Sequence, residues 1–248
     1  MAKGPRLIGA NGAPSFKILA QEWRVLPDWI AGRKAEATLA ADWPGRDRTT
    51  MVVPGMFTSD RRTALLRRVL QSAGYDSYGW ELGRNMPNKI TEVLDKLGER
   101  ISFLEARHGR PVTLIGWSLG GIVAREYAKV APDQVETVIT LGSPFSGNRK
   151  ANNAWRVYEA FAGHSVEEPP FPGTLSEKPA MPTYAIWSPR DGVIAPEAAR
   201  GEVGERDGDV QINCGHFAMA CAPDALEAVL RILSDQARKS AGDTSVAR

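Results

Sequence analysis

The sequence lacks the features that mark several classes of protein. It has only two cysteines in 248 residues, too few for a disulfide framework. No apolar run approaches transmembrane length, and none follows the basic start as in a signal peptide. The formal net charge is only +2, which gives no reason to expect nucleic acid or an anionic membrane as a partner. We therefore expect a cytoplasmic protein with no integral membrane segment, and the sequence carries no sign of its oligomeric state.

The two cysteines, Cys214 and Cys221, lie on either side of His216. They could form a small local disulfide or remain packed thiols, and a reducing cytoplasm favours thiols. No metal site is expected here, because a zinc ion would need a fourth ligand that the sequence does not offer nearby.

The length fits one large α/β domain or two small ones, and the composition is that of an ordinary globular protein. With 43% hydrophobic and 24% charged residues, the chain can bury a sizeable core. We predict a single domain over residues 1–248. It would carry an N-terminal extension at 1–45, made of helical pieces interrupted by Pro27, an insertion at 148–182 and a disordered tail at 239–248. We interpret the tryptophans of the extension as packing residues.

Apolar runs and turn signals alternate between the extension and the tail. The runs predict strands at 49–53, 75–80, 112–115, 135–141, 183–187 and 210–213, and the clearest helices between and after them lie at 61–73, 89–108 and 222–237. Most of the predicted strands are apolar throughout. The predicted fold class is therefore α/β, with a mostly parallel central β-sheet covered by helices on both faces.

The stretch 112–130 organises the chain. A short β-branched run leads into Gly116-Trp117-Ser118-Leu119-Gly120, and apolar residues at helical spacing follow. Strand, tight turn and helix form the context of a G-x-S-x-G nucleophile elbow, in which the serine hydroxyl projects beyond the strand end. The helix N-terminus behind it favours developing negative charge. The alternative is a glycine-rich turn with an exposed serine.

Three other candidates follow the ends of other predicted strands. Asp191, His216 and Met56 each follow an apolar run within a few residues, as Ser118 does. In parallel sheets, ligands bind beyond the carboxyl ends of the strands. We therefore expect all four residues to lie on one rim of the sheet.

The chain offers three histidines as partners for Ser118. His216 is the best placed base, because His108 ends a helix and His164 lies in the insertion. Asp191 would accept a hydrogen bond from the imidazole and fix its tautomer. Two carboxylates compete with Asp191 but precede the last strand, which places them at its opposite end: Asp207 and Asp209.

With these motifs the chain resembles the α/β-hydrolase superfamily, and within it bacterial lipase- and esterase-like members. The resemblance covers roughly residues 49–235. It rests on the segments 116–121, 140–144, 188–193 and 215–216, and on the order Ser, Asp, His. It implies a sheet of eight strands with a lid-like insertion between the sixth and seventh, acyl-enzyme chemistry and no cofactor.

The resemblance also implies two backbone donors for a tetrahedral oxyanion. Leu119 N–H, directly after the serine, would be one of them. In lipase-like relatives the other follows a His-Gly pair, and here Pro54 stands where His is usual, before Gly55. Met56 N–H is the resulting candidate, with Phe57 N–H as the alternative.

The predicted function is a serine hydrolase that cleaves carboxylic esters, small or lipid-like, through an acyl-enzyme on Ser118. Thioester hydrolysis or acyl transfer on the same three residues is one alternative, and a non-catalytic binding module is another. The aromatic side chains predicted to contact substrate, with those of the insertion forming a lid or acyl-pocket wall, are Phe57, Trp117, Phe145, Trp155, Phe161 and Phe171. Those of the insertion could instead simply pack it onto the core.

Overall fold

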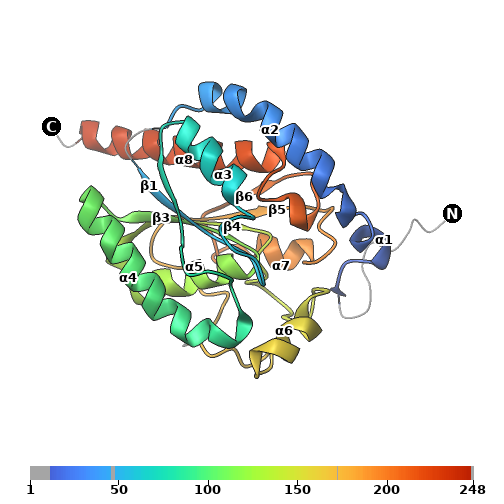
Figure 1. Cartoon of the computed structure of the whole chain (residues 1–248). Helices are drawn as coiled ribbons and strands as arrows, with labels where there is room; N and C mark the ends of the chain where they lie inside the picture. The colour runs from blue at the N-terminus through green and yellow to red at the C-terminus, as the bar shows by residue number, and fades with distance from the viewer. Residues whose placement is uncertain (1–11, 46–47, 172, 247–248) are drawn as a thin grey trace.

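A sheet of six parallel strands forms the centre of the protein (Figure 1). The structure is a computed structural model that describes residues 12–45, 48–171 and 173–246. Of residues 90–91 and 239–246 it describes the backbone alone. The strand order is β2-β1-β3-β4-β5-β6. The strands are β1 (Thr49–Val53), β2 (Asp76–Gly79), β3 (Val112–Trp117), β4 (Val135–Leu141), β5 (Thr183–Trp187) and β6 (Gly208–Gln211).

Helices cover both faces of the sheet. They are α1 (Phe16–Leu19), α2 (Val25–Asp42), α3 (Ala64–Ser72), α4 (Ile90–His108), α5 (Leu119–Val130), α6 (Trp155–Ala162), α7 (Pro196–Arg200) and α8 (Pro223–Val246), with the 3-10 turns η2 (Glu22–Arg24), η3 (Pro87–Lys89), η4 (Pro132–Gln134) and η5 (His216–Ala218). In Figure 1, α2, α3 and α8 lie above the sheet, and α4 and α5 lie below it.

The buried strands supply apolar residues to both of these layers. Val52 packs into the cluster under α3 and α8, whereas Met51 and Val53 face the cluster under α4 and α5. Successive side chains of a strand point to opposite faces, so a strand that is covered on both sides is uncharged and apolar at most positions, with threonine at some of the others. This explains the continuous apolar runs that predicted a parallel sheet.

The sheet has six strands where the resemblance implies eight. The difference lies at the N-terminus, since the described part of residues 12–45 folds into α1, η2 and α2 and adds no strand beside β2. The insertion at 148–182 was expected between the sixth and seventh of eight strands. It lies between β4 and β5, the fourth and fifth of six, so two strands follow it in either count. The last strand begins at Gly208 and not at Val210, because polar residues on this edge strand hide its start.

The N-terminal extension differs from its prediction in two ways. Pro27 does not interrupt a helix, because it lies in the first turn of α2, where a missing N–H costs no helical hydrogen bond. Trp43 packs against the core, but Trp23 and Trp29 are exposed. Trp29 lies on α2, whose apolar residues are spread around the helix instead of along one stripe, so α3 and α8 cannot cover them all. Residues 1–11 of the extension lie outside the described part.

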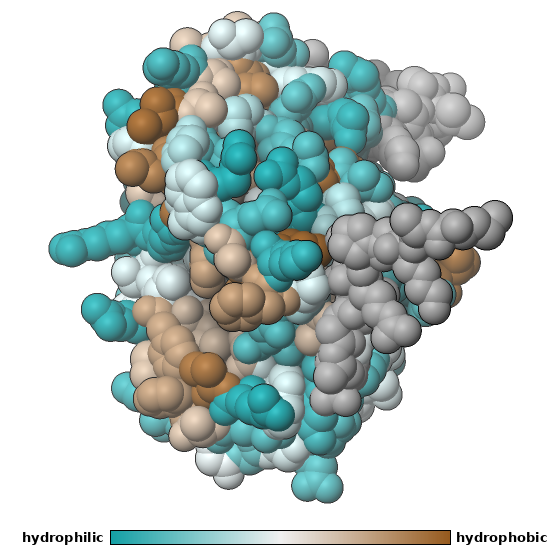
Figure 2. Space-filling view, turned by 90° about the vertical axis from the view of Figure 1, so that its right-hand side faces the viewer, coloured by the Kyte–Doolittle hydropathy of each residue, from teal (hydrophilic) through white to brown (hydrophobic). Residues whose placement is uncertain are grey.

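The surface on the side of α1 is of mixed hydropathy (Figure 2). In Figure 2, which faces the side of the molecule where α1 lies in Figure 1, apolar residues form separate groups among hydrophilic ones. The exposed large apolar side chains of the extension are Phe16, Trp23, Leu26, Trp29 and Ile30.

The closing helix is longer than the sequence predicted. Its backbone stays helical to Val246, although residues 239–248 were expected to form a disordered tail. No proline interrupts this stretch, and a single glycine is tolerated in a helix at a modest cost. Residues 247–248 lie outside the described part. Within that part, the helices are all too short or too polar to span a membrane.

The two cysteines are free and buried, which agrees with packed thiols and not with a local disulfide. Burial raises the pKa of the Cys221 thiol to about 11. Burial raises the pKa of Cys214 as well. Since only the thiolate is an effective nucleophile, both are inert packing residues.

The insertion is held to the rest of the domain near both of its ends. Near its start, Asn152 forms an antiparallel bridge with Ile194 in the loop after β5. Near its end, the buried Arg125 of α5 donates to the carbonyls of Ser176 and Glu177. The segment therefore lies across the carboxyl ends of the strands, with α6 beside η3. Pro172, within its proline-rich run, lies outside the described residues.

Candidate active site

Ser118 occupies a strained turn between β3 and α5. Its φ of 55° and ψ of −123° lie in a region that residues with a side chain rarely adopt. The turn is tight because α5 packs directly on the strand ends. A Cβ on Gly116 would lie 2.3 Å from Gly121 Cα, and one on Gly120 would lie 2.3 Å from the Val53 carbonyl oxygen. The glycines of the G-x-S-x-G pattern are thus required by close backbone approach.

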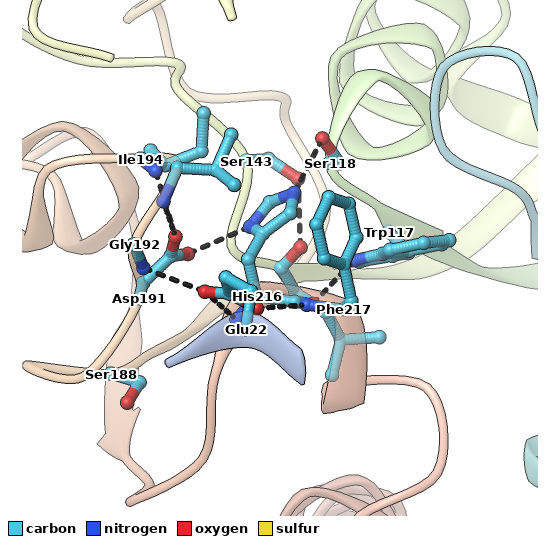
Figure 3. Close-up of polar contacts among 12 residues, drawn as sticks. Glu22, Trp117, Ser118, Ser143, Ser188, Asp191, Gly192, Ile194, His216 and Phe217 are labelled. Carbon is cyan, nitrogen blue, oxygen red and sulfur yellow. Dashed lines mark hydrogen bonds and ion pairs between the residues drawn. The ribbon is translucent and has the colours of Figure 1, made fainter. Parts of the chain in front are cut away.

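Three of the predicted site residues form one hydrogen-bonded chain (Figure 3). Ser118 Oγ lies 3.0 Å from His216 Nε2. On the other side of the ring, His216 Nδ1 lies 2.8 Å from Asp191 Oδ2. The side chains come from the ends of β3, β5 and β6, as the strand-end rule predicted. A histidine linked in this way can accept a proton at Nε2 while Nδ1–H stays bonded to the carboxylate.

The Asp191 carboxylate is held in one orientation by the loop that follows it. Its Oδ1 accepts the backbone N–H of Val193 at 2.8 Å and of Ile194 at 2.7 Å. Oδ2 is left to face the imidazole. Asp191 and His216 are both buried, so water does not compete for this hydrogen bond.

The surroundings of His216 favour its protonated form. Burial by itself lowers the pKa of His216, but the charge and hydrogen bond of Asp191, with a smaller effect of Glu22, raise it above the ordinary value. The imidazolium that forms when the ring takes a proton is therefore stabilised where it stands.

The carboxylates and histidines that compete with Asp191 and His216 for the partnership with Ser118 all have other partners. Asp207 accepts the backbone N–H of Thr183 and pairs with Lys178. Asp209 accepts from the indole of Trp187 and pairs with arginines near the start of β6. His108, the last residue of α4, contacts Tyr78 of β2, and His164 contacts Tyr158 within the insertion.

The loop after β1 brings a free backbone donor beside Ser118. A Cβ on Gly55 would lie 3.3 Å from Ser118 Cβ. In the described part of the chain, the N–H of Met56 and that of Leu119 have no hydrogen-bond partner. Phe57 N–H, the alternative donor, is already bonded to the carbonyl of Asn85 at 2.8 Å. Of the two candidates after Pro54, only Met56 has an N–H without a partner in the described residues.

A mostly apolar pocket opens beside Ser118. Its empty volume is about 630 Å³, part of which is open to solvent. Two of the predicted substrate contacts line it, Trp155 and Phe171, together with Met56 and Leu119. Further lining residues include Ile122, Pro144, Arg149, Tyr158 and Leu175. The insertion therefore supplies much of the wall.

Four predicted substrate contacts do not line this pocket. Trp117 is buried in the core under α8, and its indole donates to the His216 carbonyl at 3.1 Å. Phe145 is buried beneath the Arg125 guanidinium, 4.1 Å from it. Phe57 and Phe161 contact each other edge to face at 4.9 Å outside the pocket. Trp117 is the last residue of β3 and Phe145 follows β4, but both side chains are buried in the core.

Sequence reasoning missed two buried residues that shape the site. Asn85 holds the loop after β1, because its side chain donates to the Pro54 carbonyl and its own carbonyl accepts Phe57 N–H. Glu22 of the extension accepts backbone N–H groups beside Asp191 and His216. Neither belongs to a motif. The sequence offers only a weak indication of their role: each is a polar residue in a segment whose apolar neighbours predict partial burial.

The chain matches the model of a known protein family. A model described as the alpha/beta hydrolase family matches residues 7–177, more than half of the chain. The protein belongs to the alpha/beta hydrolase family. In the described residues of this α/β hydrolase, no group of three or more His, Cys, Asp or Glu side chains could hold a metal ion.

One curated relative is a pimeloyl-[acyl-carrier protein] methyl ester esterase of Aliivibrio salmonicida (strain LFI1238). It is 31% identical over 119 residues, which are 47% of this chain and 40% of the relative. The match thus spans less than half of that relative's length.

Two solved structures share the fold of this α/β hydrolase. The monoacylglycerol lipase of Paleococcus ferrophilus has 16% identity and a TM-score of 0.57, over 78% of this chain and 95% of its own. The thioesterase domain from the curacin biosynthetic pathway has 14% identity and a TM-score of 0.52, over 76% of this chain and 92% of its own. At these identities the likeness is one of fold.

The raised pKa of His216 gives a direct test of the site's electrostatics. An NMR titration of histidine-labelled protein should give a pKa for His216 above the ordinary value of about 6.5. Asp191→Asn should lower it, because the amide no longer stabilises the imidazolium. Asp209→Asn, a carboxylate away from the ring, should leave it unchanged. An unshifted His216 pKa in the Asp191→Asn protein would contradict the assigned pairing.

Proposed function

We propose that this protein is a serine hydrolase that cleaves carboxylic esters through an acyl-enzyme on Ser118. The observation that carries the proposal is the chain from Asp191 through His216 to the Ser118 hydroxyl. Ser118 is also held in a strained conformation at the mouth of an apolar pocket. Strain of this kind persists where it serves a mechanism, and a module that only binds ligands needs neither the strain nor the aligned base.

Acylation begins when Ser118 Oγ attacks the ester carbonyl carbon. The hydroxyl proton passes to His216 Nε2, and the carbonyl π electrons move onto the oxygen to form a tetrahedral oxyanion. Asp191 stabilises the imidazolium. When the intermediate collapses, the bond to the alcohol oxygen breaks, and His216 returns the proton to that oxygen. The products of this half-reaction are the free alcohol and the Ser118 ester.

Deacylation repeats the steps with water as the nucleophile. His216 Nε2 takes one proton from the water as its oxygen attacks the acyl carbon, and a second tetrahedral oxyanion forms. Collapse breaks the bond to Ser118 Oγ, and His216 returns the proton to that oxygen. The carboxylic acid leaves and the starting state is restored.

The oxyanion would be held by the N–H groups of Met56 and Leu119. Both lack a protein partner in the described structure and both residues line the pocket with Ser118. Leu119 also begins α5, so the positive end of the helix dipole faces the developing charge. Backbone donors fixed in this way need no reorganisation when charge develops.

The acyl part of the substrate would lie in the apolar pocket, with the insertion acting as its lid. Trp155 and Phe171 face that space. The name of the curated relative specifies a methyl ester, which supports an ester substrate for this chain too. A small or medium apolar acyl group on a small alcohol is the substrate class that we propose.

The first test concerns the nucleophile. A fluorophosphonate probe should label wild-type protein, and Ser118→Ala should lose labelling. Ester hydrolysis should fall roughly 10⁴-fold or more in the variant. Ser102→Ala, at an exposed serine of α4, is the control and should behave as wild type. A folded Ser118→Ala protein with wild-type ester hydrolysis would refute the proposal, and a labelled enzyme active only on thioesters would redirect it.

The second test concerns the oxyanion donor. Met56→Ala keeps the backbone N–H and should retain most activity. Met56→Pro removes that N–H, and loss of one donor should lower kcat by roughly 10²–10³. Circular dichroism checks the fold of the proline variant, and residual slow labelling of Ser118 shows that the nucleophile is intact. An undiminished kcat in folded Met56→Pro would exclude Met56 from this role.

The third test concerns the pocket. Trp155→Ala and Phe171→Ala enlarge the cavity, so kcat/KM for long acyl esters should rise relative to acetyl esters, by about 10-fold for each well-placed contact. Phe161→Ala is the matched control, because Phe161 belongs to the same insertion but lies outside the pocket. An equal loss on every ester for all three variants would show that the aromatics only pack the insertion.

A further inference from the structure

A buried carboxylate beside the site takes no part in the steps above. Glu22 belongs to η2 in the N-terminal extension and is 7% exposed. In Figure 3 it lies between the loop that carries Asp191 and the loop that carries His216. Its partners there are 170 to 195 residues away in sequence. A buried carboxylate that is not part of a local turn calls for a reason.

The contacts of Glu22 join the two loops. Oε1 accepts the N–H of Gly192 and the N–H of His216, both at 2.8 Å, and Oε2 accepts the N–H of Phe217 at 3.0 Å. Gly192 directly follows Asp191. One carboxylate therefore binds the backbone of the loop that carries Asp191 and the backbone of the loop that carries His216.

The glycines next to the acid and the base leave room for this grip. A Cβ on Gly215 would lie 2.8 Å from Glu22 Oε2, and a Cβ on Gly192 would lie 2.6 Å from Leu19 Cα. Both distances are shorter than real contacts of a Cβ. The extension therefore sits where a side chain on either loop would displace it.

We propose that Glu22 is a positioning residue that keeps Asp191 and His216 at hydrogen-bonding distance from each other. The N-terminal extension is then part of the active site. This inference rests on the proposed function. The two loops are also tied at their bases, where Ser188 Oγ donates to the Cys214 carbonyl at 2.7 Å. Glu22 adds the link nearest to the acid and the base, where a displacement on the order of 1 Å can cost about 10²-fold in rate.

The charge of Glu22 acts in the same direction. Two anionic groups face His216, and both Asp191 and Glu22 raise its pKa. On the other side of Phe217, Arg62 donates to its carbonyl at 2.8 Å. A small cavity beside Glu22 is lined by further charged groups: Arg24, Asp28 and Arg190. Glu22 thus favours the imidazolium that forms after Ser118 gives up its proton.

Glu22→Gln tests the role with little change in volume. The variant loses the charge and presents an NH₂ group to a backbone N–H. We expect kcat on a chromogenic ester to fall by about 10- to 100-fold. KM should stay near the wild-type value, because Glu22 does not line the pocket. The acid limb of kcat/KM against pH should move to lower pH, because the pKa of His216 falls when the negative charge is removed.

Glu36→Gln is the matched control. Glu36 belongs to the same extension and pairs with Arg68 at 2.8 Å on the helical layer, away from the site. Its loss should leave kcat and the acid limb unchanged. Equal losses of kcat in both variants would mean that the extension only stabilises the fold, and would overturn the proposal.

A spectroscopic readout makes the test independent of turnover. The His216 Nδ1 proton, which is hydrogen-bonded to the Asp191 carboxylate, should resonate far downfield in ¹H NMR. In Glu22→Gln it should shift or exchange faster with water, and in Glu36→Gln it should not. Gly215→Ala, which crowds Glu22, should repeat the change. If wild-type protein hydrolyses no ester, the proposed function fails while the NMR comparison still decides the role of Glu22. An unchanged resonance in folded Glu22→Gln, or a wild-type kcat, overturns that role.

Discussion

The close packing of α5 on the ends of the central strands is the constraint on which the site depends. It forces the backbone at Ser118 into its strained turn, admits only glycine at Gly116 and Gly120, and leaves the N–H of Leu119 free at the helix N-terminus. Strain in one residue persists only when its surroundings fix it. Here the surroundings are a sheet that is buried on both faces, so the turn cannot relax without moving β3 or α5.

Features that depend on local sequence could be predicted. The apolar runs gave the strands, and the strand-end rule placed Ser118, Asp191 and His216 on one rim, where the structure joins them. Features that depend on how distant segments meet could not. Nothing in the residues around Trp117 or Phe145 says that the core will take up their side chains. The apolar runs predicted six strands and six form, so the count of eight came from the family resemblance alone, and the extension adds helices instead of strands.

The insertion combines two kinds of contact. Its apolar residues form much of the pocket wall, whereas its backbone is held by polar contacts from the core, such as those of the buried Arg125. The guanidinium contacts carbonyls of Ser176, Glu177 and Glu205, and desolvation lowers the pKa of Arg125 to about 10. Carbonyl contacts do not depend on side-chain identity. The wall residues can therefore change in sequence while the frame that holds them stays the same.

The contact between Glu22 and His216 spans 194 residues, and this separation has a consequence for folding. Contacts between segments so far apart form only after a large loss of chain entropy, and a chain made from its N-terminus must wait for nearly all of its length before the two meet. The segments that carry the serine, the base and Glu22 are therefore made far apart in time, and the contact beside the base closes only after residue 216 has been added.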